Sequence, residues 1–599
     1  MAAAIDSRSL CGNHGCVFCS GESRQGGSIL LVRPVQYRRG DHCADSGAHW
    51  AAGRSPWYLS KSKNFSPLVL SVVLLRAGID QPAFTVNWSD QSALNPETLC
   101  DILSQINRKK TKGRSMDTQQ LVSALATGMH RERVLFKPQD VAAYECDGLT
   151  MFKAKPKVVV LPETRAEVCH VLKTCKAHGV PVVARGAGTG LSGGALPHAD
   201  GVLLVMAKFN RILEVDAEAR IARVEPGVRN LAISEAVSDL NLYYAPDPSS
   251  QIACTIGGNI AENSGGVHCL KYGLTVHNVL SVTLALDDGS VVTVGSDALD
   301  SAGYDLLALS IGSEGLLGVV LEVTVRLLPK PEEMRVVMAA FDDVTKAGDS
   351  VGNIIAAGII PAGLEMMDGP AVAAVEDFVK AGYPLDAEAL LLCEVDGTVD
   401  EVADELERVE SILRDSGATM LRVASDEAER LLFWKGRKSA FPAVGRISPD
   451  YYCMDGTIPR KHLSLVLNRM REMSKRYGLR CANVFHAGDG NLHPLILFDA
   501  NDPEEVQRAE QFGAEILELS VEVGGTITGE HGVGVEKINE MCVQFSSDEL
   551  TQFHSVKAAF DPTGILNPGK AVPTLNRCAE FGKMHIHHGQ MPHPELERF

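Results

Sequence analysis

The sequence predicts an α+β protein with two domains, and three observations lead to this prediction. Strand-like and helix-like segments alternate early, with the strand VVVLP (158–162), a helix over 164–179 and the strand VPVVAR (180–185). Two stretches, ILEVDAEARIARVEPG and LSVTLALDDGSVVTVG, have the alternating pattern of β-hairpins. The prolines of LPKPEE then mark a boundary, after which long helical segments lie between short strands.

Single residues support these elements. In the helix over 164–179, Val168, Leu172 and Cys175 fall on one face, and Gly179 follows as the stop. The second hairpin has an Asp-Gly turn at Asp288 and Gly289. Further helices are expected over 230–240 and over 399–417.

Composition limits the function. The net charge is −18 over 599 residues, which argues against nucleic-acid binding, because such binding depends on basic surface. No apolar run approaches the roughly 18 residues that a membrane span needs. We therefore expect a cytoplasmic protein that is held at the inner face of the cell membrane only through partners.

Residues 1–115 look different from the rest. They end in the basic run RKKTKGRS and show no sustained helical or strand period. We expect a non-native or disordered N-terminal extension, with Met116 as the true start. Cys11, Cys16 and Cys19 have an iron–sulfur-like spacing, but a fourth cysteine at a usual distance is missing, so we expect no cluster here.

The loop RGAGTGLSGGALP (185–197) follows a predicted strand directly. It contains a G-x-G-x-x-G match, but Pro197 and another strand follow instead of the helix that a Rossmann site requires. Its backbone N–H groups could still form a phosphate nest. Two more segments of small residues, 246–266 and 312–327, would let backbone lie against a flat, extended ligand.

The stretch FHAGDGNLHP (485–494) places His486 and His493 on either side of a glycine-rich turn. A turn between two strands could aim both imidazoles at one point. In GEHGVG, Glu530 and His531 lie in a second glycine-framed turn. Imidazole and carboxylate together are typical ligands of a borderline divalent metal, and the alternative is histidines that are satisfied in a turn or in the core.

These motifs carry a resemblance. RGAGTGLSGG, TIGGNIAENSGG and GSEGLLG resemble the FAD-binding domain of the vanillyl-alcohol-oxidase type of flavoproteins. The stretches 434–459, 483–501, 529–538 and 560–570 resemble the FAD-linked subunit of bacterial glycolate oxidase, which is close to D-lactate and D-2-hydroxyacid dehydrogenases. The resemblance runs from about residue 118 to the end of the chain.

The resemblance implies a fold and a domain division. It implies a two-part FAD-binding domain of that type over 116–331 and an α+β substrate-binding cap domain over 332–560. Residues 561–599 would form a C-terminal segment that returns to the FAD, and a tail.

The resemblance also implies the cofactor site. FAD would be bound noncovalently, because no histidine precedes His198 in the pyrophosphate loop. The residues implied to hold it are Arg185, Gly186, Ala187, Gly188, Thr189, Gly190, Ser192, Gly193, Gly194, Pro246, Asp247, Ile256, Gly257, Gly258, Asn259, Ala261, Asn263, Gly265, Glu314, Gly315, Asn567 and Lys570.

In the related dehydrogenases the matching His, His and Glu bind a metal. The resemblance therefore implies His486, His493 and Glu530 as ligands of Zn²⁺ or a similar ion, with His531 as the general base. Arg437 would bind the substrate carboxylate, and its alternative is an ordinary surface arginine. Hydride would pass from C2 of the substrate to flavin N5.

The expected substrate is a small 2-hydroxy acid. Tyr451 and Tyr452 stand where relatives that oxidise a longer diacid carry a lysine, which favours glycolate or D-lactate. Electrons would pass to an iron–sulfur subunit in a complex that also has a smaller flavin-domain subunit. The alternatives are a stand-alone D-lactate or other D-2-hydroxyacid dehydrogenase and a non-catalytic flavin-binding subunit, which would lack the HAGDGNLH and GEHGVG motifs.

Overall fold

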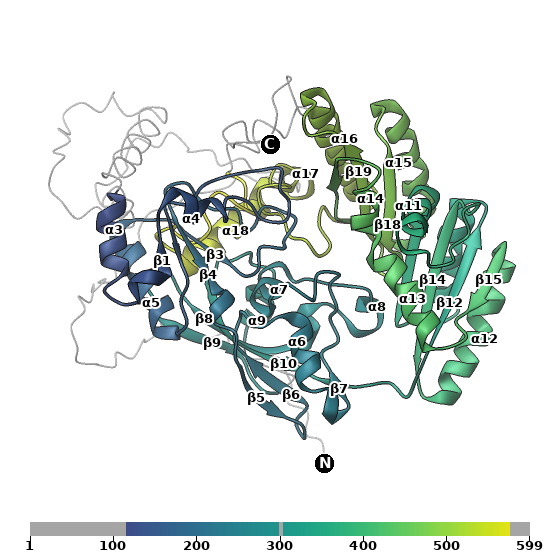
Figure 1. Ribbon diagram of the computed structural model, residues 1–599, viewed down its shortest axis with the longest axis horizontal. Coiled ribbons are helices and arrows are strands. Elements are labelled where there is room, and N and C mark those ends of the chain that lie inside the picture. The colour runs from purple at the N-terminus through teal and green to yellow at the C-terminus, as the bar shows by residue number, and fades with distance from the viewer. Residues whose placement is uncertain (1–115, 299–302, 575–599) are drawn as a thin grey trace, which may run out of the picture. The chain divides into compact units, whose positions relative to one another are not determined.

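The computed structural model describes residues 116–298 and 303–574 (Figure 1). The predictions for residues 1–115, including those for the three cysteines there, and for the tail 575–599 lie outside these residues. Within the described ranges, no helix is both long enough and apolar enough to cross a membrane.

The first sheet has the strand order β1-β2-β4-β3. Helix α5 (Arg165–His178) begins at a capping box on Thr164 and ends at Gly179, whose φ is 62°. It follows β2, and β3 follows it, but β4 lies between these two strands and pairs with both in parallel. The predicted strand–helix–strand unit is therefore present, but one strand, β4, lies between its two strands. The four strands are β1 (Val134–Leu135), β2 (Val158–Val160), β3 (Val182–Arg185) and β4 (Val202–Val205).

The second sheet is antiparallel, with the order β5-β6-β10-β8-β9. Both predicted hairpins are confirmed: β5 pairs with β6, and β8 pairs with β9 around the turn at Gly289, whose φ is 71°. The strands are β5 (Ile212–Asp216), β6 (Ile221–Val224), β8 (Val279–Ala285), β9 (Val291–Gly295) and β10 (Val319–Arg326). A two-stranded ribbon joins β7 (Leu242–Tyr243) to β11 (Leu328–Pro329).

Short helices accompany these two sheets. The helix expected over 230–240 is α6 (Asn230–Ala236) followed by a 3₁₀ turn. The others are α3 (Thr118–Leu125), α4 (Pro138–Ala142), α7 (Ile256–Glu262), α8 (Cys269–Tyr272) and α9 (Leu306–Ser310).

The third sheet has eight strands in the order β15-β12-β14-β13-β18-β19-β16, and β17 also pairs with β19. Its pairings are antiparallel. The strands are β12 (Glu333–Phe341), β13 (Gly363–Asp368), β14 (Ala389–Gly397), β15 (Met420–Val423), β16 (Asp450–Cys453), β17 (Gly456–Thr457), β18 (Cys481–His486) and β19 (Asn491–Phe498).

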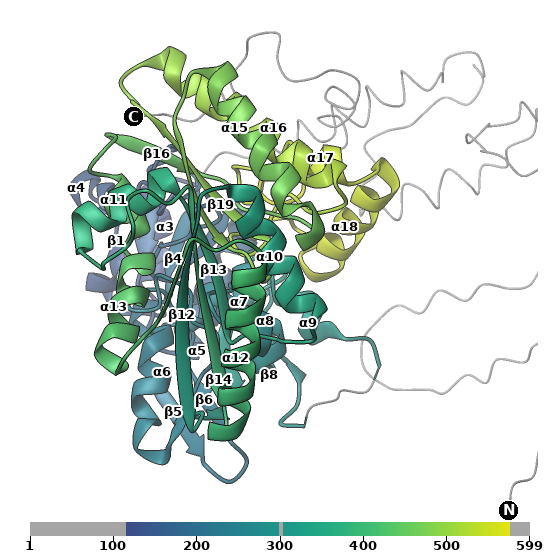
Figure 2. The ribbon, with the colours of Figure 1, turned by 90° about the vertical axis from the view of Figure 1, so that its right-hand side faces the viewer.

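Helices cover both faces of this sheet, as Figure 2 shows for β12 and β14 seen between α11 and α13 on one side and α10 and α12 on the other. We call the face under α10, α12, α15 and α16 the apolar face; its side chains include Met366 and Phe485. We call the opposite face, under α11, α13 and α14, the polar-bearing face; it includes Met367 and Val484. Neighbouring residues of one strand thus belong to different cores. The helices are α10 (Val344–Ala356), α11 (Gly369–Val379), α12 (Val399–Asp415), α13 (Glu427–Lys438), α14 (Ala440–Val444), α15 (Leu463–Tyr477) and α16 (Pro503–Glu522).

The end of the described chain returns to the first sheet. After α17 (Met541–Gln544) and α18 (Ser547–Phe560), Leu566 makes a parallel bridge with Val182 of β3. The Asn567 N–H donates to the Val182 carbonyl at 2.8 Å. Residues 561–574 therefore lie beside the strand that carries the glycine-rich loop.

Candidate functional site

One cavity of about 390 Å³ brings together the three small-residue segments and the histidine motifs. Its walls include His493, Glu530 and His531. The expected cofactor residues on its walls are Arg185, Gly186, Ala187, Gly188, Thr189, Gly190, Gly194, Gly257, Gly258, Asn259, Ala261, Gly265, Glu314 and Gly315. A flat, extended ligand and a reactive group can therefore share this space.

Glycine is required where these segments approach each other. A Cβ at Gly186 would lie 2.2 Å from Thr255 Oγ1. Gly188 has a φ of 75°, which side chains other than glycine seldom adopt, and a Cβ there would meet the Arg185 guanidinium. The loop therefore presents bare backbone to the cavity, as close contact with a pyrophosphate needs.

The other expected cofactor residues do not line the cavity; they are Ser192, Gly193, Pro246, Asp247, Ile256, Asn263, Asn567 and Lys570. Two of them, Asn567 and Lys570, make hydrogen bonds to backbone carbonyls of the glycine-rich loop. Asn567 Nδ2 donates to the carbonyls of Gly194 at 3.1 Å and Glu314 at 2.7 Å. Lys570 Nζ donates to the Gly194 carbonyl at 2.9 Å and to the Leu196 carbonyl, and burial lowers the pKa of Lys570 to about 7.

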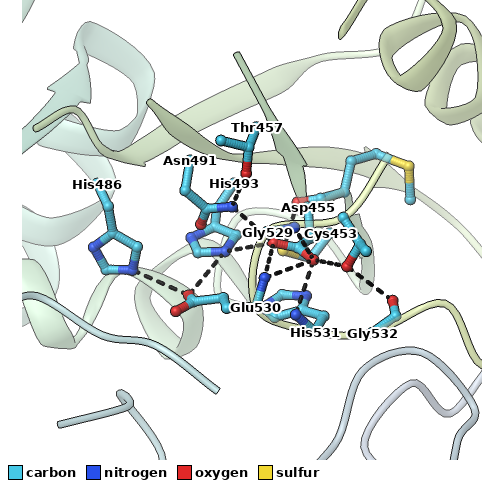
Figure 3. A network of polar contacts seen from close by, with 12 residues as sticks. Cys453, Asp455, Thr457, His486, Asn491, His493, Gly529, Glu530, His531 and Gly532 are labelled. Atoms are coloured by element: carbon cyan, nitrogen blue, oxygen red, sulfur yellow. Dashed lines mark hydrogen bonds and ion pairs between the residues drawn. The ribbon is translucent and has the colours of Figure 1, made fainter. Parts of the chain in front are cut away.

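The two histidines converge through the β18–β19 hairpin. His486 ends β18 and pairs with Asn491, and His493 follows on β19, so both rings lie on the polar-bearing face. His486 Nε2 and His493 Nε2 each lie 3.2 Å from Glu530 Oε1 (Figure 3). The three side chains offer ligand atoms within 4.8 Å of one another.

The donor set fits a divalent ion. His493 Nε2 is close to Glu530 but is not directed at it, and this buried nitrogen has no hydrogen-bond partner. Two imidazole nitrogens and one carboxylate are the ligands of many open zinc sites. Burial opposes the charged form of His486, but the carboxylates of Glu365 and Glu530 outweigh it and raise the pKa of His486 well above its usual range. A cation bound at Nε2 would have to replace the proton there.

Glu365 was not expected at the site. It lies on β13, where its Oε1 is 2.7 Å from His486 Nδ1 and its Oε2 is 2.5 Å from Arg437 Nη2. A carboxylate on the second ring nitrogen fixes the orientation and tautomer of a ligand histidine. The signal that could have revealed Glu365 is an acidic residue between the apolar residues of the strand segment GLEMM.

Arg437 is only 4% exposed, so it is not a surface arginine. It pairs with Glu365 and does not line the cavity, and its Nε has no hydrogen-bond partner. Arg437 therefore lies close to His486, because both side chains contact the carboxylate of Glu365.

His531 stacks on His493, with ring centroids 4.8 Å apart and planes 9° from parallel. Burial lowers the pKa of His531 to about 4. Its ring is therefore neutral near pH 7, and its Nδ1 has no hydrogen-bond partner. A neutral imidazole on a cavity wall, with one ring nitrogen lacking a hydrogen-bond partner, can accept a proton.

Asp455 organises the loop that carries Glu530 and His531, and this role was not predicted from the sequence. Its fully buried carboxylate accepts the backbone N–H groups of Gly529 at 3.0 Å, Glu530 at 3.1 Å and His531 at 2.9 Å. Lys537 Nζ, also buried, lies 3.3 Å away and compensates its charge. The Asp-Gly pair in YYCMDGTIP was the available signal.

Tyr451 and Tyr452 point to opposite faces of the sheet. Tyr452 belongs to the core of the apolar face, and Tyr451 packs on the polar-bearing face. Neither lines the cavity. Tyr451 instead contacts Phe441, which does line it, with ring centroids 5.8 Å apart.

Comparisons with known proteins agree with this architecture. Residues 156–295 match the family model of an FAD binding domain, and residues 330–571 match that of the C-terminal domain of FAD linked oxidases. The chain is 63% identical over 484 residues to the glycolate oxidase subunit GlcD of Escherichia coli K12, which covers 81% of this chain and 97% of that protein. It is 41% identical to the Bacillus subtilis subunit of that name, over 71% of this chain and 91% of that one. A D-lactate dehydrogenase of Anaerostipes hadrus is 32% identical, over 70% and 90%.

Solved structures confirm the fold. p-Cresol methylhydroxylase matches with a TM-score of 0.63 at 17% identity, over 76% of this chain and 97% of that one. The 4-ethylphenol oxidase of Gulosibacter chungangensis matches with a TM-score of 0.63 at 18% identity, over 77% and 98%. The expected FAD-binding fold is therefore confirmed, whereas the roles of single site residues stay predictions.

Proposed function

This chain belongs to the FAD-linked oxidases, in the family of the glycolate oxidase subunit GlcD, and from that premise we propose that it oxidises glycolate to the 2-oxo acid. D-lactate is the second substrate that we propose. The observation that carries the proposal is that one cavity is lined both by the glycine-rich segments and by His493, Glu530 and His531.

The residues present fit both groups that this chemistry needs. FAD along the loops at Gly188 and Gly258 would supply the hydride acceptor. A divalent ion such as Zn²⁺, held by His486, His493 and Glu530, would supply the Lewis acidity that lowers the pKa of the substrate hydroxyl.

The chain's own side chains divide the remaining work. His531 is proposed as the base that accepts the hydroxyl proton, because its ring is neutral and lines the cavity, and its Nδ1 has no hydrogen-bond partner. Glu365 holds the orientation of His486. Arg437 does not line the cavity, so the role that its position supports is to hold Glu365. Its contact with the substrate carboxylate stays a prediction.

We also propose that the chain works in a complex. The relatives with the highest identity quoted above are named as subunits, which supports an assembly of several chains. An iron–sulfur subunit would accept the electrons, and a smaller flavin-domain subunit would complete the complex. Purification of the tagged chain from its native cells should retain an iron-containing partner, and recovery of the chain alone would contradict this part of the proposal.

The test of the reaction is anaerobic. The purified chain with its flavin is mixed with glycolate and, in a separate sample, with D-lactate, and the visible flavin absorption is followed. We expect bleaching with glycolate, lost after treatment with a chelator and restored by Zn²⁺. Bleaching by D-lactate alone would make the chain a D-lactate dehydrogenase, and no bleaching by either acid would contradict the proposal.

A further inference from the structure

The cavity wall contributed by residues beyond 330 is small. Of the described residues in that part, six line the cavity: His493, Glu530, His531, Lys438, Phe441 and Pro442. The first three have proposed roles toward the hydroxyl and its proton. The other three, at the corner between α13 and α14, have none.

This corner lies over the same sheet face as the histidines. Ala440, Ala443 and Val444 of α14 pack into the core of the polar-bearing face. Phe441 is half-buried and Pro442 is exposed, so the wall runs from the interior at Phe441 toward solvent at Pro442. Lys438 is already engaged, because its Nζ lies 3.4 Å from Asp247 Oδ2.

The Phe441 ring is backed by a second aromatic ring. Its centroid lies 5.8 Å from that of Tyr451, with the planes at 73°, which is a favourable edge-to-face contact. Tyr451 is held on β16 opposite Leu497. Phe441 therefore cannot move away from the cavity in that direction without displacing a residue of the sheet.

We infer that Phe441, backed by Tyr451, forms the wall that limits the size of the substituent on C2 of the substrate, and so restricts the chain to the shortest 2-hydroxy acids. This inference rests on the proposed function. In the proposed reaction, the hydroxyl and carboxylate would lie toward the histidines and the reacting C–H toward the flavin loops. A longer substituent would then extend toward the wall contributed beyond residue 330, whose half-buried apolar member is Phe441.

The test compares Phe441→Ala, Phe441→Leu and Phe441→Trp with the wild type, each purified with its flavin. The probes are glycolate, D-lactate, D-2-hydroxybutyrate and D-2-hydroxyvalerate, and kcat/KM is taken from anaerobic flavin reduction. For each methylene that newly fits, we expect the value relative to glycolate to rise about 10-fold in Phe441→Ala. Phe441→Leu should shift the same way by less, and Phe441→Trp should lower D-lactate relative to glycolate.

The matched control is Phe378→Ala, an exposed phenylalanine of α11 that does not line the cavity. It should leave the chain-length profile unchanged. If Phe441→Ala does not fold, the Leu and Trp variants carry the test. Unchanged profiles in flavin-loaded Phe441 variants would overturn the inference, whereas a wild type reduced by none of the acids would instead overturn the proposed function.

Discussion

The two faces of the eight-stranded sheet are built from the same strands but carry different chemistry. On β18, Phe485 packs into the apolar face and is fully buried, and its neighbour His486 points to the other face and contacts Glu365 and Glu530. On β13, Met366 and Glu365 divide in the same way. The alternation of side chains along a strand therefore separates packing from chemistry.

The difference teaches how buried charge is tolerated here. Glu365 is 1% exposed, but His486 and Arg437 contact its two oxygens. Asp455 is fully buried, but three backbone N–H groups and Lys537 surround it. Unpaired charges would cost several kcal/mol each in such surroundings, so these partners are what allows the two carboxylates to be buried.

The largest expected effect is a loss of flavin reduction rate, caused by a change at the histidine site of the polar-bearing face. His531→Gln removes the proposed base, so flavin reduction by glycolate should slow by about 10²- to 10⁴-fold. Stopped-flow reduction under anaerobic conditions measures this rate. The FAD content and the free energy of unfolding should stay close to those of the wild type. A rate within a factor of three of the wild type would remove His531 from the proposed role.

The second prediction concerns a substitution in the core of the apolar face, which should lower stability and leave the chemistry intact. Phe485→Ala should lower the free energy of unfolding by about 3–5 kcal/mol, because it leaves a cavity in the main core. Denaturant unfolding measures this loss. The flavin of the folded fraction should still be reduced by glycolate at nearly the wild-type rate. A rate loss as large as that of His531→Gln would mean that the two faces are not separable.

A third substitution tests whether metal binding depends on Glu365 and not on the neighbouring residue of the apolar face. Glu365→Gln keeps the size of the side chain but removes the charge that holds His486, so Zn²⁺ affinity should fall about 10- to 100-fold. Competition with a chromogenic chelator measures the affinity without turnover. Met366→Leu, one residue along but on the apolar face, is the control and should leave Zn²⁺ affinity unchanged. Equal affinities in both variants would contradict the role given to Glu365.

Local signals allowed much of this to be predicted. Thr164 and Gly179 delimit α5, and the turn at Asp288 and Gly289 gives the β8–β9 hairpin, because these signals lie within a few residues of each other. The meeting of His486 and His493 also follows from one turn.

Pairings between distant segments could not be predicted in this way. Neither the strand order of the third sheet nor the insertion of β4 between β2 and β3 follows from periodicity. Glu365 meets His486 across 121 positions, and Asp455 meets His531 across 76. Both acidic residues could be read in the sequence, but their contacts with distant residues could not be predicted from it.

The smallest expected effect comes from the end of β13, where a carboxylate lacks the cations that surround Glu365. Asp368 accepts hydrogen bonds from the Ala371 N–H at 3.1 Å and from Asn483 Nδ2 at 2.6 Å, and burial raises the pKa of Asp368 to about 6. A raised folded-state pKa contributes stability at low pH that is lost as the pH rises through 6. Between pH 5 and pH 7 the wild type should lose on the order of 1 kcal/mol that Asp368→Asn does not lose. Denaturant unfolding at both pH values measures the difference, and parallel pH profiles for the two proteins would show that Asp368 is ionised in the folded chain like an ordinary carboxylate.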